Sequence, residues 1–344
     1  MTVNDTTGQA FDLLPHEQKL RVLAELSRAA TAQYELPSDC NIEMVNLSEN
    51  ATYKVEDTAS GRRWALRVHR DGYHSDAAVA SELAWLVDLR AKGVVATPVP
   101  VPGLDGNVIQ KVPHAAMPRP RNVVLFDWES GIEPGVDEDL REPFEVLGEV
   151  TARMHQHVKT WQRPAAFERF TWDFETALGD DRPHWGRWRD GMGVDAAKQD
   201  LFGQTVDLIG QRLAAYGKSE NRFGLAHCDL RLANLLIDGS EVKVIDFDDC
   251  GFSWFMYDAA TPVSFYEHLP EVTDLIRHWL LGYRRVIDLP QADEDEIPTF
   301  VMLRRLLLVA WIGSHSETEL AQSMGLDYSE QTVELCKTYL RRFG

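Results

Sequence analysis

The sequence predicts an α+β protein of two lobes, in which a five-stranded antiparallel sheet with one inserted helix precedes a mainly helical lobe. Segments rich in β-branched and aromatic residues gather in the first part of the chain, and long segments with helical periodicity dominate later. One later patch, 223–248, is again β-rich. We therefore expect an N-terminal helical extension at 1–40, an N-lobe at 41–130 and a C-lobe at 131–344.

The composition is that of a folded protein with an acidic surface. Of the 344 residues, 44% are hydrophobic and 26% are charged, close to the average of globular domains. The net charge of −19 repels a phosphate backbone and argues against nucleic acid as a partner. Four widely spaced cysteines match neither a disulfide framework nor a zinc site, which favours a reducing compartment.

The sequence gives no membrane signal. Residues 1–14 contain neither the basic segment nor the apolar core of a signal peptide. The longest apolar stretch, 306–312, is too short to span a bilayer. We therefore expect a cytoplasmic protein without a membrane partner, and its oligomeric state stays open.

The first elements follow from local patterns. Apolar residues at helical spacing predict a helix from Pro15 to about Tyr34, with proline at a position that a helix start tolerates. Three antiparallel strands are predicted between Asn41 and Arg70, and the turn-like segment 58–61 joins the second to the third.

A second helix is predicted to begin after Ser75 and to end at Gly93. Its expected apolar face consists of Val79, Leu83, Leu86 and Val87. Glu82 lies at the edge of that face, so we expect it to point inward. Two further strands, at 106–113 and 121–130, follow a proline-rich extended connection and complete the sheet.

The rest of the chain is predominantly helical. The segment 131–143 is rich in glycine, proline and acidic residues and marks the expected lobe boundary. Helices are predicted at 144–158, at 197–216 and in several stretches after Asp258. The Trp-rich segment 161–188 has no clean period, so it is either aromatic packing between helices or a loop that covers a site.

The strongest functional pattern lies at 225–248, in LAHCDLRLANLLIDGSEVKVIDFD. It contains H-x-D-x-x-x-x-N at His227, Asp229 and Asn234, and a D-F-D element that begins at Asp246. Three fixed positions alone arise readily by chance. The added D-F-D element makes the match specific.

The turn sequence Asp238-Gly239 predicts a β-hairpin within this pattern. If the hairpin centres between Gly239 and Ser240, Asn234 pairs near Ile245. This register brings Asn234 and the first aspartate of D-F-D to the same open end, close to the loop aspartate. Three oxygen-bearing side chains then converge on one point.

Such a cluster suits Mg²⁺, which prefers oxygen ligands and binds together with substrate phosphates. We expect Asp246 to bridge the metal to a nucleotide and Asn234 to supply a second metal contact. Asp229 is expected to accept or orient the proton of an attacking hydroxyl as the catalytic base. His227 is expected mainly to hold the loop, with acid–base chemistry as the alternative.

On these motifs the chain resembles the aminoglycoside phosphotransferase and choline kinase-like superfamily, especially its homoserine kinase-like or stress-response kinase-like branch. The resemblance runs from about Asn46 to Asp258. It implies a bilobal protein-kinase-like fold with ATP and Mg²⁺ as cofactors. It also implies that Asp258 anchors the catalytic loop.

The same resemblance implies a nucleotide site in the N-lobe. Arg67, in W-A-L-R-V, takes the place of the usual strand lysine that contacts phosphates, and Glu82 is its partner. A surface salt bridge of little energy is the alternative for this arginine.

Two weaker nucleotide contacts follow from the resemblance alone. The turn L-S-E-N-A-T-Y would cover the phosphates around Ser48 and Asn50, although it contains no glycine. Backbone groups around Phe126 and Trp128 occupy the hinge position that binds adenine in the superfamily.

The resemblance places a small hydroxylated acceptor between the catalytic loop and C-terminal helices. These helices and their surroundings include Trp254, Tyr266, Arg304 and Trp311. An amino acid or amino alcohol is the leading hypothesis, because acidic and aromatic surroundings suit an ammonium group. The alternatives are an aminoglycoside, a protein Ser/Thr side chain, a non-catalytic nucleotide-binding regulatory module and a metal-dependent hydrolase. Asp248 and Asp249 face either solvent, metal or substrate.

Overall fold

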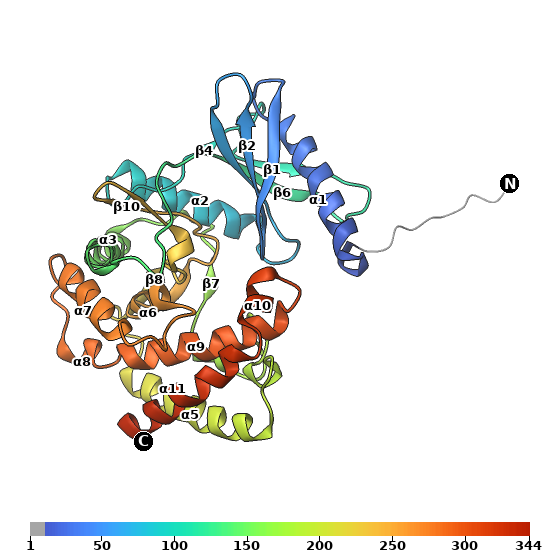
Figure 1. The fold of residues 1–344 in the computed structure, drawn as a ribbon. Helices are drawn as coiled ribbons and strands as arrows, with labels where there is room; N and C mark the ends of the chain where they lie inside the picture. Colours follow the sequence, from blue (N-terminus) through green and yellow to red (C-terminus); the bar gives the residue numbers. More distant parts are fainter. Residues whose placement is uncertain (1–10) are drawn as a thin grey trace. The chain divides into compact units, whose positions relative to one another are not determined.

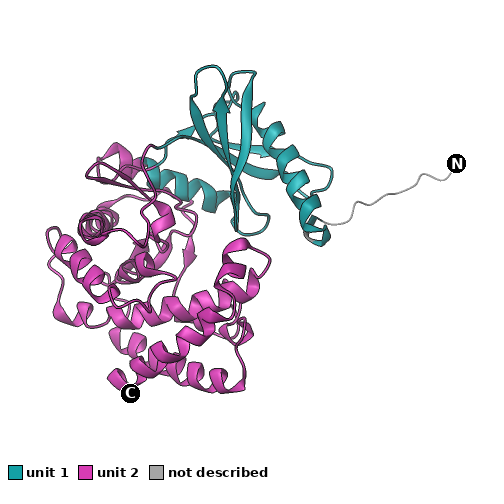
Figure 2. Cartoon of the chain, viewed as in Figure 1, with its two compact units in different colours: residues 1–87, 98–129 teal, residues 88–97, 130–344 magenta. Residues whose placement is uncertain are grey.

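The computed structural model describes residues 11–344, so the expectation about an amino-terminal signal falls largely outside the described residues. The chain, drawn as a ribbon in Figure 1, forms two compact units, which Figure 2 shows in teal and magenta. Unit 1 comprises Met1–Val87 and Pro98–Glu129, and unit 2 comprises Asp88–Thr97 and Ser130–Gly344. The short segment Asp88–Thr97 therefore belongs with the helical part of the chain.

Unit 1 is an antiparallel sheet with two helices. Its elements are α1 (His16–Thr31), β1 (Cys40–Leu47), β2 (Ala51–Asp57), β3 (Arg63–Val68), α2 (Asp76–Ala91, which continues into unit 2), β4 (Pro100–Val101), β5 (Ile109–Val112) and β6 (Arg121–Asp127). The strand order is β1-β2-β3-β6-β4, and β5 also pairs with β6. The sheet thus has the five predicted strands and a short sixth, β4, because the prolines hold this connection extended beside β6.

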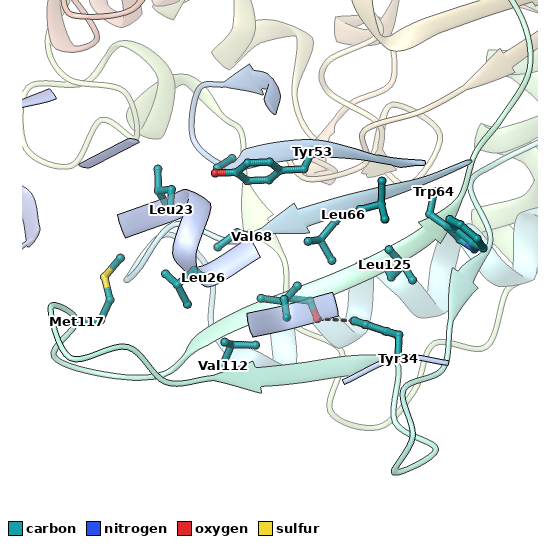
Figure 3. Close-up of a cluster of buried hydrophobic side chains, with 14 residues drawn as sticks. Leu23, Leu26, Tyr34, Tyr53, Trp64, Leu66, Val68, Val112, Met117 and Leu125 are labelled. Atoms are coloured by element: carbon teal, nitrogen blue, oxygen red, sulfur yellow. Dashed lines mark hydrogen bonds between the residues drawn. The ribbon is translucent and has the colours of Figure 1, made fainter. Parts of the chain in front are cut away.

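Helix α1 packs its apolar face on this sheet. Figure 3 shows Leu23 and Leu26 of the helix among strand residues such as Tyr53 and Leu66. Strand β2 alternates buried and partly exposed positions along its whole length, as a strand with one covered face does. Burying each large apolar side chain in such a core contributes roughly 1.5–3 kcal/mol. This core fixes the strand that carries Arg67.

Helix α2 begins and ends as predicted. The hydroxyl of Ser75 accepts a hydrogen bond from the backbone N–H of Ala78 (3.0 Å), and Gly93 beyond its end has φ = +64°. Glu82 is completely buried. The predicted apolar face is wrong at Val87, which is 46% exposed, because successive helical residues are 100° apart and the buried face is centred nearer Leu86.

Unit 2 is mainly helical. Its elements are α3 (Arg141–Thr160), β7 (Phe170–Thr171), α4 (Phe174–Leu178), α5 (Ala196–Tyr216), β8 (Phe223–Ala226), β9 (Leu235–Asp238), β10 (Glu241–Val244), β11 (Gly251–Trp254), α6 (Tyr257–Ala260), α7 (Val272–Tyr283), α8 (Gln291–Glu294), α9 (Ile297–Ser314), α10 (Glu319–Met324) and α11 (Asp327–Phe343). Strand β11 pairs antiparallel with β8 and parallel with β7, and β9 and β10 form a separate hairpin.

Helix α9 is the central helix of unit 2 and contacts α5, α6 and α11. The segment Gln291–Ser314 is longer than the apolar stretch identified from sequence, and by length and composition it would be able to cross a membrane. However, 78% of its apolar window is buried inside the protein. A buried core helix of a soluble protein has the same composition, so the segment is explained by its packing.

Helices α3 and α7 lie side by side and approach each other closely (Figure 1). Two glycines make this approach possible. A Cβ at Gly148 would lie 1.9 Å from the backbone oxygen of Trp279, and a Cβ at Gly282 would lie 1.7 Å from that of Glu145. Because both obstacles are backbone atoms, a side chain at either position would force the helices apart.

We therefore expect Gly148→Ala to lower the free energy of unfolding by about 1–3 kcal/mol through overpacking. Gly203→Ala is the matched control, since Gly203 also lies inside a helix, α5, but the nearest atom to its Cβ is 3.8 Å away. There the higher helix propensity of alanine should raise stability by roughly 0.5–1 kcal/mol. Denaturant unfolding of both variants measures the difference; equal effects would contradict the packing argument.

Candidate active site

The β9–β10 hairpin has the register that the sequence predicted. Asp238 pairs with Glu241, which leaves a two-residue turn, and Gly239 in that turn has φ = +63°. At the open end, the backbone N–H of Ile245 donates to the carbonyl oxygen of Asn234 (2.9 Å). Asn234 and the residue that follows Ile245, Asp246, therefore lie together where the hairpin opens.

Asn234 also contacts Asp229 directly. Its Nδ2 donates to Asp229 Oδ2 (2.7 Å) and to the Asp229 carbonyl oxygen (2.8 Å), and both residues are buried. Because these contacts use the amide nitrogen, they orient the amide oxygen away from the aspartate. That oxygen is the atom a metal ion would need.

Backbone strain marks the same region. Among the described residues, the non-glycine residues with positive φ are Cys228 (68°), Asp246 (56°) and Phe265 (77°). Such conformations cost on the order of 1–3 kcal/mol each and cluster at functional sites. Cys228 precedes Asp229, and Asp246 is the first residue of D-F-D. Phe265 carries no sequence signal, and it follows Ser264, whose contact with Arg304 is described below.

Asp258 holds the backbone of the loop that leads to Asp229. Its carboxylate accepts hydrogen bonds from the backbone N–H groups of His227 (3.0 Å) and Cys228 (2.7 Å). His155 of α3 lies with Nε2 at 3.0 Å from Asp258 Oδ2, and its Nδ1 lies 3.0 Å from the hydroxyl of Tyr283 in α7. A continuous buried chain thus runs from the loop to the α3–α7 pair.

His155 was not identified from the sequence. It lies at i+4 from Thr151 on the buried face of α3, and a polar residue on an apolar helical face is the signal that would have revealed it.

His227 lies inside the loop that Asp258 holds. It is completely buried, and its Nδ1 accepts a hydrogen bond from the backbone N–H of Asp229 (3.2 Å). Burial lowers the pKa of His227. The neutral imidazole therefore carries its proton on Nε2 and holds the loop residue Asp229 through the other nitrogen.

Two arginines neutralise Asp229. A guanidinium nitrogen of Arg304, in α9, donates to Asp229 Oδ1, and Arg231 Nε lies 3.3 Å from Asp229 Oδ2. Burial by itself raises the pKa of Asp229, but the charges of Arg304 and Arg231 hold the pKa below its ordinary value. Asp229 is therefore an ionised carboxylate.

The Trp-rich segment 161–188 packs against the residues of this site. Arg169 Nε donates to the carbonyl oxygen of Cys250 (2.6 Å), and Trp172 Nε1 donates to that of Asp249 (2.7 Å). Trp185 lies with its ring 5.3 Å from the Arg304 guanidinium. Of the two interpretations, aromatic packing is correct for these tryptophans, because they are buried against the loop that follows D-F-D and against α9.

Asp248 and Asp249 are buried, so the possibility that both are simply solvent-exposed at a strand end is wrong.

The other residues considered for the acceptor region have different partners. Trp254 Nε1 donates to the Gly217 carbonyl (2.7 Å), and the Tyr266 hydroxyl donates to the Pro262 carbonyl (2.6 Å). Trp311 stacks on His315 at the end of α9. Of this set, Arg304 is the residue that touches Asp229.

In unit 1, Arg67 and Glu82 form a buried ion pair. Arg67 Nη2 lies 2.7 Å from both carboxylate oxygens of Glu82, and its guanidinium lies 5.3 Å from the Phe126 ring. The alternative of a weak surface salt bridge is wrong, because both side chains are buried. A buried charge pair of this kind fixes the direction of the arginine.

The remaining N-lobe candidates are held by local structure. Asn50 Oδ1 accepts a hydrogen bond from the backbone N–H of Arg70 (3.0 Å), and the Ser48 N–H donates to the Asn50 carbonyl (3.0 Å). The Asn50 side chain thus joins the β1–β2 turn to the end of β3. Trp128 follows β6 and is 40% exposed.

The donor set at the hairpin end fits Mg²⁺ better than a zinc-type ion. Within residues 11–344, no group of three or more His, Cys, Asp or Glu side chains is placed to hold a metal by itself. Mg²⁺ uses one or two protein oxygens together with phosphate oxygens and water. The Asp246 carboxylate and the Asn234 amide oxygen meet that requirement.

The buried chain through Asp258 predicts a graded loss of stability. Asp258→Asn replaces an acceptor oxygen with an NH₂ group, so we expect it to lower the free energy of unfolding by about 3 kcal/mol. Tyr283→Phe removes only the outer end of the chain and should cost about 1 kcal/mol. Asp274→Asn, which breaks an exposed pair with Arg277, is the control and should stay within about 0.5 kcal/mol. Chemical denaturation tests this order, and an Asp258→Asn variant as stable as the control would refute it.

Two solved structures similar to this chain are named as kinases of small molecules. The structure of the microcompartment-associated aminopropanol kinase is 43% identical to this chain, with 93% of this chain and 98% of that chain covered and a TM-score of 0.85. The amicoumacin kinase hAmiN, solved with AMP-PNP, Ca²⁺ and Ami, is 21% identical, with 95% and 96% covered and a TM-score of 0.74, which shows the common fold.

Sequence comparison agrees. The amicoumacin kinase of Bacillus subtilis (strain 168) is 28% identical over 305 residues, which cover 85% of this chain and 84% of that protein. The model of the phosphotransferase enzyme family APH matches residues 45–289. The predicted resemblance and the bilobal protein-kinase-like fold are thereby confirmed. The chain belongs to the APH phosphotransferase enzyme family and is a small-molecule kinase.

Proposed function

We propose that the protein transfers the γ-phosphate of ATP to the hydroxyl of a small amino alcohol, with Asp229 as the catalytic base. The observation that carries this proposal is the convergence of Asp229, Asn234 and Asp246 at the open end of the β9–β10 hairpin, where Cys228 and Asp246 have strained backbones. The acceptor class follows from the relative named as an aminopropanol kinase, with which this chain shares 43% of its residues.

Asp229 would receive the acceptor hydroxyl. Each carboxylate oxygen has two lone pairs, so the contacts of Asn234 and Arg231 on Oδ2 and of Arg304 on Oδ1 leave room for one more donor, on Oδ1. Because both arginines keep the carboxylate ionised, it would orient the hydroxyl oxygen for in-line attack and take the proton as the bond to phosphorus forms.

Asp246 and Asn234 would hold Mg²⁺ with the nucleotide phosphates. When bound, the metal would neutralise charge on the phosphates during transfer. The chain's own contribution is to keep the two oxygen atoms at one end of the hairpin, through the Ile245 to Asn234 backbone bond.

Unit 1 would bind the nucleotide. Arg67 offers fixed N–H donors that suit phosphate oxygens, and Glu82 keeps its guanidinium in one direction. The backbone near Phe126 and Trp128 would bind adenine, and the turn at Ser48 and Asn50 would cover the phosphates through backbone N–H groups. The Asn50 side chain is already engaged with Arg70, so we assign it no direct phosphate contact.

A larger amine-bearing acceptor is the second candidate. The 28% identical relative is named amicoumacin kinase, so an antibiotic of that kind belongs in any acceptor panel. An aminoglycoside, an amino acid and a protein substrate complete the set of alternatives.

Asp229→Asn tests the reaction. With Mg-ATP and a panel of aminopropanol isomers, ethanolamine, homoserine, amicoumacin and an aminoglycoside, wild type should release ADP with at least one acceptor. The variant should lose roughly 10²–10⁴-fold in kcat, the usual contribution of a positioned base. Asp207→Asn, on the exposed face of α5, is the control and should keep full activity.

Three results of this assay would count against the proposal. Full turnover by Asp229→Asn would show that Asp229 is not the catalytic base. A preference for a protein or aminoglycoside acceptor would overturn the acceptor class. Mg-ATP binding without any turnover would favour a regulatory module.

Arg67 is best tested with a double variant that leaves no buried charge behind. Arg67→Met combined with Glu82→Gln removes the ion pair at similar volume, so the fold should persist. Loss of the phosphate contact should weaken Mg-ATP binding at least tenfold, or about 1.4 kcal/mol, by isothermal titration calorimetry. Glu82→Gln alone keeps the guanidinium and should weaken binding less. Unchanged affinity in the double variant would show that Arg67 does not touch the nucleotide.

A further inference from the structure

Arg304 is a buried arginine with a partner for each of its three nitrogens. Its side chain is 2% exposed in the middle of α9. Nε donates to Ser264 Oγ (3.0 Å), Nη1 donates to the Tyr257 hydroxyl (3.3 Å), and Nη2 donates to Asp229 Oδ1. Since the guanidinium is planar and rigid, these three contacts fix its position as well as its direction.

The carboxylate of Asp229 is consequently held from both sides. Arg304 occupies Oδ1, and Asn234 occupies Oδ2 from the hairpin end. Arg231 also approaches Oδ2, but its side chain is more exposed, so its charge is screened more by water. Arg304 is the buried charge that balances Asp229.

The neighbouring Arg305 shows what a purely structural arginine does here. It is completely buried and pairs with the buried Glu267 (2.7 Å). Its other nitrogens donate to Thr332 Oγ1 (2.7 Å) and to the Tyr328 carbonyl (2.7 Å), which ties α9 to α11. Arg305 makes no contact with Asp229, so the two adjacent arginines form a matched pair for experiment.

An amino alcohol offers two groups to a carboxylate. Its ammonium group forms an ion pair with the carboxylate, whereas its hydroxyl donates a hydrogen bond without carrying a charge of its own, so the ammonium contact is the stronger one. A bare Asp229 would therefore bind the amine first and leave the hydroxyl away from the γ-phosphate. The fixed positive charge of Arg304 beside Asp229 removes this preference, because the guanidinium repels an ammonium group.

We propose that Arg304 is a positioning residue that holds Asp229 for attack and prevents the acceptor's ammonium group from taking the place of its hydroxyl. This inference rests on the proposed function and deepens it, since it states how the site orients an acceptor with two competing groups. The ammonium group of the acceptor must then bind away from Asp229, while its hydroxyl contacts Asp229.

The test compares Arg304→Met with Arg305→Met. In Arg304→Met, kcat for the aminopropanol isomer that wild type uses should fall about 100-fold, the cost of a misplaced reacting group. KM for Mg-ATP should stay within threefold. Both variants should lower the melting temperature to a similar extent. Circular dichroism measures the folded fraction of each variant, and kcat is calculated per folded molecule. On that basis Arg305→Met should keep kcat within threefold of wild type.

Binding of n-propylamine gives a readout that structural damage does not produce. This probe carries the ammonium group and no hydroxyl. Titrated calorimetrically with Mg²⁺ and AMP-PNP present, it should bind Arg304→Met at least tenfold more tightly than wild type. Equal or weaker binding would overturn the inference, as would a kcat within threefold of wild type or an equal loss in Arg305→Met.

A milder variant covers the case in which Arg304→Met does not fold. Ser264→Ala removes the acceptor for Nε together with the hydroxyl's own bond to the Thr261 carbonyl (2.7 Å), but it leaves no buried charge unpaired, so the fold should persist. We expect kcat to fall about fivefold with KM for Mg-ATP unchanged. Unchanged kcat would overturn the inference. If Asp229→Asn is inactive and these variants are fully active, only the role of Arg304 fails. If Asp229→Asn is active, the proposed function itself fails.

Discussion

The site depends on the hydrogen bonds that the carboxylate of Asp258 accepts from the loop before Asp229. By accepting the backbone N–H groups of His227 and Cys228, this carboxylate offsets the cost of burying two polar groups and fixes the chain just before Asp229. Cys228 has a left-handed backbone, which an ordinary residue adopts only when its surroundings hold it there. The position of Asp229 is therefore set by a residue 29 positions away in sequence.

Asp258 is itself held from the core of unit 2, because His155 contacts both its carboxylate and the hydroxyl of Tyr283. The histidine and the tyrosine come from helices whose close contact requires Gly148 and Gly282. From the other side, α9 supplies Arg304, and the Trp-rich segment supplies the side chains beneath it. Asp229 is thus held by elements from the whole of unit 2. A site assembled this way can keep its geometry while the residues that face different acceptors vary.

Much of this arrangement follows from local sequence. The hairpin register depends on Asp238-Gly239 and on alternating apolar residues, and both act over a few positions. The sheet of unit 1, the start of α2 and the inward direction of Glu82 likewise follow from periodicity and capping. Val87 was misplaced because the edge of a helical face depends on what packs beside it.

The contacts that sequence could not supply are long-range. Arg304 was named as one of four residues near the acceptor, but its bond to Asp229 joins positions 75 residues apart. His155 has no motif of its own, and Phe265 is strained without a glycine to mark it. Such roles arise from tertiary packing, which residue type and spacing do not encode.

The proposed reaction makes a phosphate ester from ATP and a small amino alcohol. Phosphorus NMR of wild type with Mg-ATP and each aminopropanol isomer tests it directly. We expect ADP and one new phosphomonoester signal to appear in equal amounts. ADP accompanied only by inorganic phosphate, or unchanged ATP with every isomer, would contradict it.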